Sequence, residues 1–229
     1  IGCFVETNSG GPWEYARVEI DNAGKVVLYS GCNSVGQGVD TVLSQIVADE
    51  LQVRLEDVRV VHGDTAQVPY GNGSNASRTT VMAGSAAVGA SRKVKDKLLR
   101  VASAALEIDP EDLLLADGKV GARGAPERSL SYAEMVQLAA PGSALKKGFD
   151  PGISEEDFFA SDRRLFPYGV HVAVAEVDRE TGLVKVLDYL IAEDVGRKIN
   201  PMLIEGQMAG GLAQGIGGAL LEEFVYDTD

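Results

Sequence analysis

Residues 16–31, ARVEIDNAGKVVLYSG, and residues 173–196, AVAEVDRETGLVKVLDYLIAEDVG, follow the same pattern. Each begins with a strand in which apolar and polar residues alternate, reaches a turn that contains an acidic residue and a glycine, and returns as a second strand. Such alternation is typical of a β-hairpin with one buried face. A loop and a helical pattern follow each hairpin. The repeat predicts an α+β fold of two related lobes, each with helices packed on a mostly antiparallel sheet.

The segment between the two repeats differs from both in composition. Residues 140–164 contain two prolines, three glycines and an acidic run, so we expect a linker there. This places the first lobe at residues 1–145 and the second, incomplete at its C-terminal end, at residues 146–229. The spacing of apolar and turn residues predicts further elements: helices over 39–51, 79–106 and 131–139, a strand over 58–61, a short hairpin around 117–118, and a glycine-rich helix after the second repeat.

Composition restricts the class of protein. The chain has 229 residues, with 21 Lys plus Arg against 34 Asp plus Glu, a formal net charge of −13. Such a surface repels a phosphate backbone, so we expect no nucleic-acid partner. No apolar run reaches the ~18–20 residues of a membrane span. Cys3 and Cys32 suit reduced thiols, and no secretory signal pattern is present, so we expect a cytoplasmic protein.

The first of three glycine clusters is Gly36-Gln37-Gly38, which opens a helical pattern after a strand. A helix N-terminus presents unpaired N–H groups, glycine lets a ligand approach the backbone, and the Gln37 amide can donate and accept at once. These properties suit an uncharged heterocycle or an oxyanion. They suit a plain helix-start turn with an exposed glutamine equally well, and the spacing alone does not decide between the two.

The second cluster, GNGSNASRTT at residues 71–80, again lies between a strand and a helix. Gly71, Gly73 and Ala76 fit the dinucleotide-binding pattern GxGxx[GA]. However, the loop is too long for that motif, and Asp96, near the position of a ribose-binding acid, falls inside a lysine-rich helical pattern. An NAD-dependent dehydrogenase is therefore disfavoured.

The same stretch suits a cradle for a phosphate or a pterin. Ser77, Thr79 and several N–H groups gather at a helix start, and Arg78 can supply positive charge. The alternative is a cluster of N-capping residues on a long helix.

The third cluster, EGQMAGGLAQGIGGA at residues 205–219, lies within a helical pattern. Each glycine weakens a helix by up to ~1 kcal/mol, a cost that close backbone contact with a neighbour offsets. Gln214 lies among small residues, where a polar side chain needs a partner, so we expect it to be buried and hydrogen-bonded. Tight helix–helix packing through a glycine face is the alternative.

Taken together, these motifs resemble the molybdopterin-binding large subunit of the xanthine dehydrogenase, aldehyde oxidase and carbon monoxide dehydrogenase family. The matching pieces occur in the family's order and cover most of the chain: GQGVDT at 36–41, VRVVHGDTAQVPYGNGSNASRTTVMAGSAA at 58–87, GVHVAVAEVDRETG at 169–182, and DVGRKINPMLIEGQMAGGLAQGIGGALLEE at 194–223. The resemblance implies the family's two-lobed α+β cofactor domain. Its cofactor is a molybdenum pyranopterin, in bacteria often the cytosine dinucleotide form.

The resemblance also implies the cofactor-binding residues. Gln37, between Gly36 and Gly38, matches the family's cofactor-contacting glutamine. Gln214 matches the glutamine that hydrogen-bonds the pterin near the metal. The segment that wraps the pterin and its phosphate tail corresponds to Ala76, Ser77, Arg78 and Thr79.

The family reaction is hydroxylation of an aldehyde, an N-heterocycle or a CO-like substrate with water-derived oxygen, and electrons leave through iron–sulfur and FAD partners. The metal is held by the pterin dithiolene, so the resemblance implies no protein metal ligand, and His62 and His171 are expected to be structural. The family's general-base Glu lies in a Gly-Glu motif downstream of ALLEE, so no catalytic residue is assigned in this chain. We expect a fragment that is inactive without the remainder of its large subunit; a non-catalytic scaffold homologue is the alternative.

Overall fold

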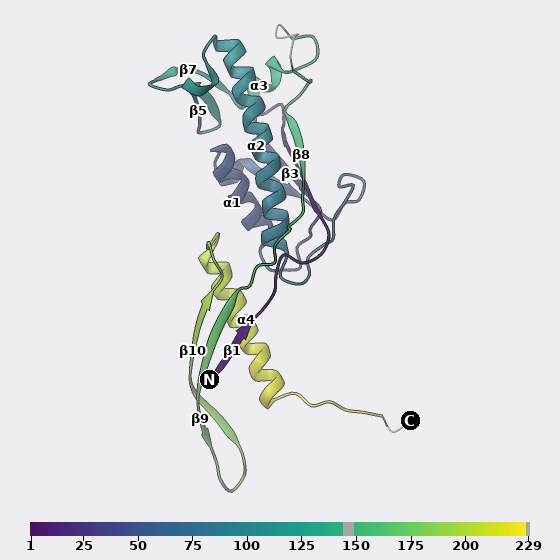
Figure 1. Ribbon diagram of the computed structural model, residues 1–229, viewed down its shortest axis with the longest axis vertical. Helices are drawn as coiled ribbons and strands as arrows, with labels where there is room; N and C mark the ends of the chain where they lie inside the picture. Colours follow the sequence, from purple (N-terminus) through teal and green to yellow (C-terminus); the bar gives the residue numbers. More distant parts are fainter. Residues whose placement is uncertain (144–148, 228–229) are drawn as a thin grey trace. The chain divides into compact units, whose positions relative to one another are not determined.

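The computed structural model describes residues 1–143 and 149–227, and it divides them into two compact units (Figure 1). The larger unit is formed by Ser9–Arg164, and the smaller by Ile1–Asn8 together with Leu165–Asp229. The lobe boundary predicted between residues 145 and 146 falls on residues 144–148, which lie outside the described residues. In the structure, the N-terminal residues 1–8 belong to the same unit as the second repeat.

The larger unit is built on a four-stranded sheet in the order β4-β3-β2-β8. The predicted hairpin is confirmed as β2 (Glu14–Ile20) and β3 (Val26–Ser30), which pair antiparallel. The predicted strand is β4 (Val58–Val61), and it pairs parallel to β3. This parallel pair matters for the site, because the carboxyl ends of parallel strands meet at the same edge of a sheet.

The fourth strand, β8 (Ser154–Phe159), lies inside the segment that the sequence predicts to be a linker. That prediction is wrong for these residues, because β8 pairs antiparallel with β2 at the edge of the sheet. Its inward side chains include the acids Glu155 and Asp157, which form ion pairs with Lys97 and Lys93 of the neighbouring helix. The strand was missed because charged residues occupy positions where the period-2 pattern requires apolar ones.

Two helices cover one face of this sheet: α1 (Val39–Leu51) and α2 (Thr79–Leu106), both at the predicted bounds. In Figure 1, α2 runs alongside α1 and close to β8. Along α2, the small residues Ala83, Ala86 and Ala90 are fully buried, which lets the helix backbone approach the sheet closely. The main core lies between this helical layer and the sheet.

A smaller sheet and a short helix extend the larger unit. The predicted hairpin around residue 117 is β5 (Leu113–Ala116) and β6 (Lys119–Ala122), and β7 (Ala125–Ser131) adds a third strand. The helix α3 (Tyr132–Leu138) follows, as predicted, and begins with a capping box between Ser131 and Glu134.

The smaller unit contains an antiparallel sheet in the order β1-β9-β10, followed by one helix. The strands are β1 (Gly2–Val5), β9 (Tyr168–Val177) and β10 (Val184–Asp194), and the helix is α4 (Pro201–Leu220). The Asn200 side chain caps α4 by accepting a bond from the Leu203 N–H at 3.1 Å. Among the described residues, no helix combines the length and apolar character needed to cross a membrane.

The predicted repeat is visible in the chemistry of its two turns. Asp21 between β2 and β3 accepts two backbone N–H bonds through one carboxylate oxygen, and Asp178 between β9 and β10 does the same. Gly24 and Gly182 then take left-handed φ angles of 78° and 74°. Strand, turn, strand, loop and helix follow one another in both units, as expected for an α+β fold of related parts.

Candidate cofactor-binding site

The first two glycine clusters lie at the same edge of the larger unit. The first follows β3 and leads into α1, and the second follows β4 and leads into α2. Because β3 and β4 are parallel neighbours, both loops leave the sheet at its carboxyl edge, and both helices begin there. The topology thus brings together two N-terminal helix ends that are 40 residues apart in the sequence.

The two loops contact each other through backbone that leaves no room for side chains. A Cβ atom on Gly31 would lie 2.6 Å from the Cα of Gly71, well inside the distance of any real contact. Nearby, the Ser74 hydroxyl donates to the Asn33 carbonyl and accepts from the Thr79 hydroxyl at 3.1 Å. The loops therefore form one continuous structure.

In the first loop, Gly36 and Gly38 take positive φ angles of 105° and 80°, a conformation that glycine adopts without strain. Gln37 lies between them, and its side-chain carbonyl accepts a bond from the Val35 N–H at 2.7 Å. The loop thus fixes the Gln37 carbonyl and leaves the NH₂ group of the amide as a donor. Space in front of this turn is open, because a Cβ on Gly36 would have no neighbour within 4 Å.

In the second loop, Ala76 and Ser77 have left-handed φ angles of 45° and 53°, which is uncommon for residues other than glycine. Arg78 then returns to right-handed helical angles. Successive residues of opposite hand are typical of a concave backbone nest, but here the Arg78 N–H donates to the Asn75 carbonyl at 3.0 Å and is not available to a ligand. Ala76 and Ser77 are both exposed, so this concave backbone faces away from the core.

Neither helix start is capped by a side chain. Gly38 is the N-cap of α1 and Arg78 that of α2, and neither accepts a side-chain capping bond from the first turn. The first helical bonds are donated by Val42 to Gly38 at 3.1 Å and by Met82 to Arg78 at 2.8 Å. The N–H groups of residues 39–41 and 79–81 therefore have no acceptor within their own helices.

The Arg78 side chain points into the protein and is fully buried. Its guanidinium donates to the carbonyls of Gly10 at 3.0 Å and Pro12 at 2.8 Å, and it forms an ion pair with the buried Glu14 carboxylate. The positive charge of Arg78, which the sequence suggested for binding a phosphate, is thus paired with Glu14 inside the fold. Sequence reasoning missed Glu14 because an acid at the start of an alternating strand usually marks an exposed position.

Two residues in or next to the loops, Cys32 and Asp64, have shifted pKa values. Cys32 is fully buried, and loss of solvation raises the pKa of its thiol to about 11, so it is a neutral packing residue. In the second loop, bonds from the Gln67 amide and the Ala66 N–H lower the pKa of Asp64. The Asp64 carboxylate is therefore ionised and accepts hydrogen bonds within its own turn.

The third cluster lies on α4, in the smaller unit. Gln214 is exposed, and no residue of α4 is buried, so the expectation of a buried Gln214 is wrong for the described chain. A Cβ on Gly210, Gly211 or Gly215 would have no neighbour within 4 Å, so the glycine face of α4 is open. The assignment of Gln214 to the cofactor stays a prediction.

Neither histidine belongs to a ligand cluster. His62 Nε2 lies 2.7 Å from Asp40 Oδ1, and His171 lies between Tyr189, at 3.1 Å, and Glu193, at 3.3 Å. Within the described ranges, no group of three or more His, Cys, Asp or Glu side chains is placed to hold a metal ion.

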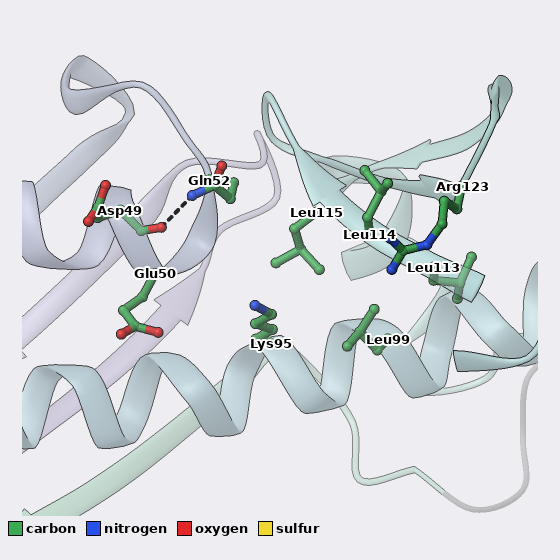
Figure 2. Close-up of a pocket in the computed structure, with 9 residues that line it drawn as sticks. All are labelled: Asp49, Glu50, Gln52, Lys95, Leu99, Leu113, Leu114, Leu115 and Arg123. Carbon is green, nitrogen blue, oxygen red and sulfur yellow. Dashed lines mark hydrogen bonds between the residues drawn. The ribbon is translucent and has the colours of Figure 1, made fainter. Parts of the chain in front are cut away.

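A separate cleft of about 450 Å³ lies where the C-terminal end of α1 meets α2 and β5 (Figure 2). Leu99 and Leu115 contribute apolar walls, and Lys95, Glu50 and Arg123 contribute charged groups. None of the predicted site residues lines it. The predicted cradle, in contrast, is a surface of backbone donors at the N-terminal ends of α1 and α2.

The whole chain, residues 1–229, matches the family of the molybdopterin cofactor-binding domain. It is 40% identical over 229 residues to the 6-hydroxypseudooxynicotine dehydrogenase complex subunit gamma of Paenarthrobacter nicotinovorans, which covers 100% of this chain and 29% of that protein. It is 32% identical over 239 residues to the carbon monoxide dehydrogenase large chain of Afipia carboxidovorans, which covers 99% of this chain and 29% of that protein.

Two solved structures of molybdenum enzymes and oxidoreductases are also similar to this chain. Quinoline 2-oxidoreductase from Pseudomonas putida 86 matches with a TM-score of 0.87 and 35% identity, covering 99% of this chain and 30% of that one. The Cu,Mo-CO dehydrogenase matches with a TM-score of 0.89 and 30% identity over the same shares. The chain therefore belongs to the molybdopterin cofactor-binding domain family of molybdenum hydroxylases, as the motifs predicted. It spans about three tenths of the length of these relatives.

The residues of the cradle fit the family's cofactor. A pyranopterin presents hydrogen-bonding ring edges and a phosphate, both of which need donors at a surface that a bulky ligand can reach. The two uncapped helix starts and the Gln37 amide supply such donors. The open space beside Gly36 leaves room for the ligand.

Proposed function

We propose that this chain binds a molybdenum pyranopterin, in its cytosine dinucleotide form, through the two joined glycine loops. The observation that carries the proposal is the convergence of two uncapped helix N-termini at one sheet edge, locked together where Gly31 meets Gly71. Backbone N–H groups at such positions favour phosphate oxygens, because the helix dipoles add to the hydrogen bonds.

Each residue of the cradle has a distinct task in this proposal. The N–H groups of Ser77 and Thr79 bind the phosphate tail, and Ala76 and Arg78 shape the turn that presents them, because the Arg78 N–H donates to the Asn75 carbonyl at 3.0 Å. Gly36 and Gly38 let the pterin approach the backbone. When bound, the molybdenum group supplies the oxidation–reduction chemistry, which none of the side chains at the cradle can provide.

Gln37 and Gln214 are proposed to bind the pterin through their side-chain amides. An amide both donates and accepts, which matches the mixed donor and acceptor edge of a pterin ring. Gln37 is held by its bond to the Val35 N–H, so its orientation is set before the ligand arrives. Gln214 presents its amide on the exposed glycine-rich face of α4.

For the whole protein, we propose the large subunit of a cytoplasmic molybdenum hydroxylase that introduces water-derived oxygen into a small molecule. An N-heterocyclic substrate is favoured over an aldehyde or a CO-like substrate. Support comes from relatives named for nicotine and for quinoline, both N-heterocycles, at 38% and 35% identity. The partners are the remainder of the large subunit and iron–sulfur and FAD-containing subunits. This chain alone is expected to be inactive.

The test uses the full-length protein in its native complex. Molybdenum is measured by elemental analysis, and CMP is measured after acid release of the cofactor. We expect both in stoichiometric amounts, and we expect Gln37→Ala to lower them, whereas Gln137→Ala, an exposed glutamine on α3, leaves them unchanged. A complex without molybdenum would refute the proposal and favour a scaffold, and molybdenum without CMP would refute the dinucleotide form.

A further inference from the structure

Two opposite charges, on Glu14 of β2 and Arg78 at the start of α2, are completely buried and paired with each other. Both side chains have 0% exposure. Removing two charges from water is costly, and apolar residues of similar volume often stabilise a fold at least as well. Overall stability is therefore a weak explanation for the presence of this ion pair. The contacts of the two side chains indicate a different explanation.

The contacts of Arg78 hold the second loop to the chain before β2. Its guanidinium donates to carbonyls of Gly10 at 3.0 Å, Pro12 at 2.8 Å and Gly73 at 3.4 Å. The planar guanidinium can serve several acceptors in fixed directions, which a lysine cannot do. Because Arg78 is also the N-cap of α2, its side chain fixes the position of the first-turn N–H groups.

Glu14 contacts both loops of the cradle. One carboxylate oxygen binds Arg78, and the other lies 3.4 Å from the Asn72 N–H, which donates to it. The same second oxygen lies against Gly31, where a Cβ atom would collide with it. The carboxylate therefore lies at the crossing of the first loop, through Gly31, and the second loop, through Asn72 and Arg78.

We propose that the buried Glu14–Arg78 pair is a positioning device that sets the relative placement of the two cofactor-binding loops. This proposal rests on the proposed function and assigns roles to two residues that do not touch the cofactor with their side chains. Glu14 positions the backbone at Gly31 and Asn72, and Arg78 positions the N–H groups at the start of α2. Loss of either charge leaves the loops folded but displaced relative to each other.

The chain offers a matched control. Lys97 of α2 and Glu155 of β8 form a second ion pair in the same unit, at 3.1 Å, with the Lys97 side chain 5% exposed. This pair also joins α2 to the sheet, but it lies about 27 Å along the helix from Thr79. Glu155→Gln therefore reports what the loss of a largely buried ion pair does to stability without disturbing the cradle.

The experiment compares Glu14→Gln and Glu155→Gln in the full-length protein within its complex. The readouts are Tm, molybdenum content, CMP content, and the rate at which molybdenum is lost on incubation. A bond to a charged group contributes enough that we expect about tenfold weaker cofactor retention in Glu14→Gln. Glu155→Gln should retain the cofactor even where its Tm falls as far.

Wild-type retention of molybdenum by Glu14→Gln would overturn the proposal, and so would cofactor loss in both variants in proportion to Tm. If Glu14→Gln does not fold, the double variant Glu14→Met with Arg78→Met replaces it. A folded double variant depleted of cofactor supports the proposal, whereas one with full cofactor, or one that does not fold, assigns the pair to stability alone. A wild-type complex without molybdenum would instead refute the proposed function.

Discussion

Replacement of Gly71 by alanine should force the two glycine loops, which follow β3 and β4, apart. The new Cβ would lie 2.0 Å from the carbonyl oxygen of Gly31, about 1.4 Å closer than the 3.4 Å at which ordinary contact begins. Backbone cannot rotate away as a flexible side chain can, so the loops must separate by nearly that amount. The bond from the Asn72 N–H to Glu14, already 3.4 Å long, would then be lost.

The size of the effect follows from these contacts. Overpacking costs about 1–3 kcal/mol, and a lost bond to a buried carboxylate adds about 1 kcal/mol or more. We therefore expect Gly71→Ala to lower the free energy of unfolding by about 2–4 kcal/mol and to lower molybdenum content. Unfolding in urea, followed by circular dichroism on the full-length protein, measures the first effect, and elemental analysis measures the second.

Gly10→Ala is the control for this prediction. A Cβ on Gly10 would have no neighbour within 4 Å, and its φ lies outside the left-handed region, so a change within about 0.5 kcal/mol is expected. If Gly71→Ala behaves like Gly10→Ala in both stability and molybdenum content, the argument from the close approach of the loops is refuted.

Three further predictions concern the larger unit. Tyr132→Phe should cost about 1–2 kcal/mol, because it leaves the buried Leu51 carbonyl without its donor; an unchanged urea midpoint would contradict this. Bonds from Arg54 lower the pKa of Asp57, so its stabilising contribution is present above the unfolded-state pKa, about 3.9, and is lost as pH falls through the lower folded-state pKa. Asp57→Asn should therefore lower Tm near neutral pH but not in strong acid, and a difference that persists in acid would argue against this assignment. Burial raises the pKa of Cys32 to about 11, so its thiol should resist iodoacetamide at mildly alkaline pH until the chain unfolds. Rapid labelling of Cys32 in the folded state, measured by mass spectrometry, would contradict this prediction.

Local patterns in the sequence were enough to predict most of the elements. The bounds of α1 and α2 were correct at both ends, because apolar spacing and turn residues at each end are local signals. The acidic turns of the two hairpins were recognised for the same reason. Strand β8 was missed because its inward acids form ion pairs with lysines of α2, a helix that is remote in sequence.

The candidate site was predictable in its parts but not in its assembly. The motifs predicted a cofactor-binding role for Gln37 and for the segment from Ala76 to Thr79, and this stays a prediction. The role of the Arg78 side chain depended on which way it points. Its inward direction is set by Glu14, 64 residues earlier, and no periodicity connects the two positions. Gln214 was expected to be buried from its small neighbours, but burial depends on what packs against α4.

The sequence by itself determined most of the secondary structure, the repeated hairpin units and the family, because each follows from residues near one another or from motifs read in order. Only the tertiary structure decided that the loops of the first two glycine clusters lie against each other. The parallel pairing of β3 and β4 places both loops at the same sheet edge, and the crossing of Gly31 and Gly71 joins them. Such contacts depend on strand order and on the direction of buried side chains, which are properties of the folded chain as a whole.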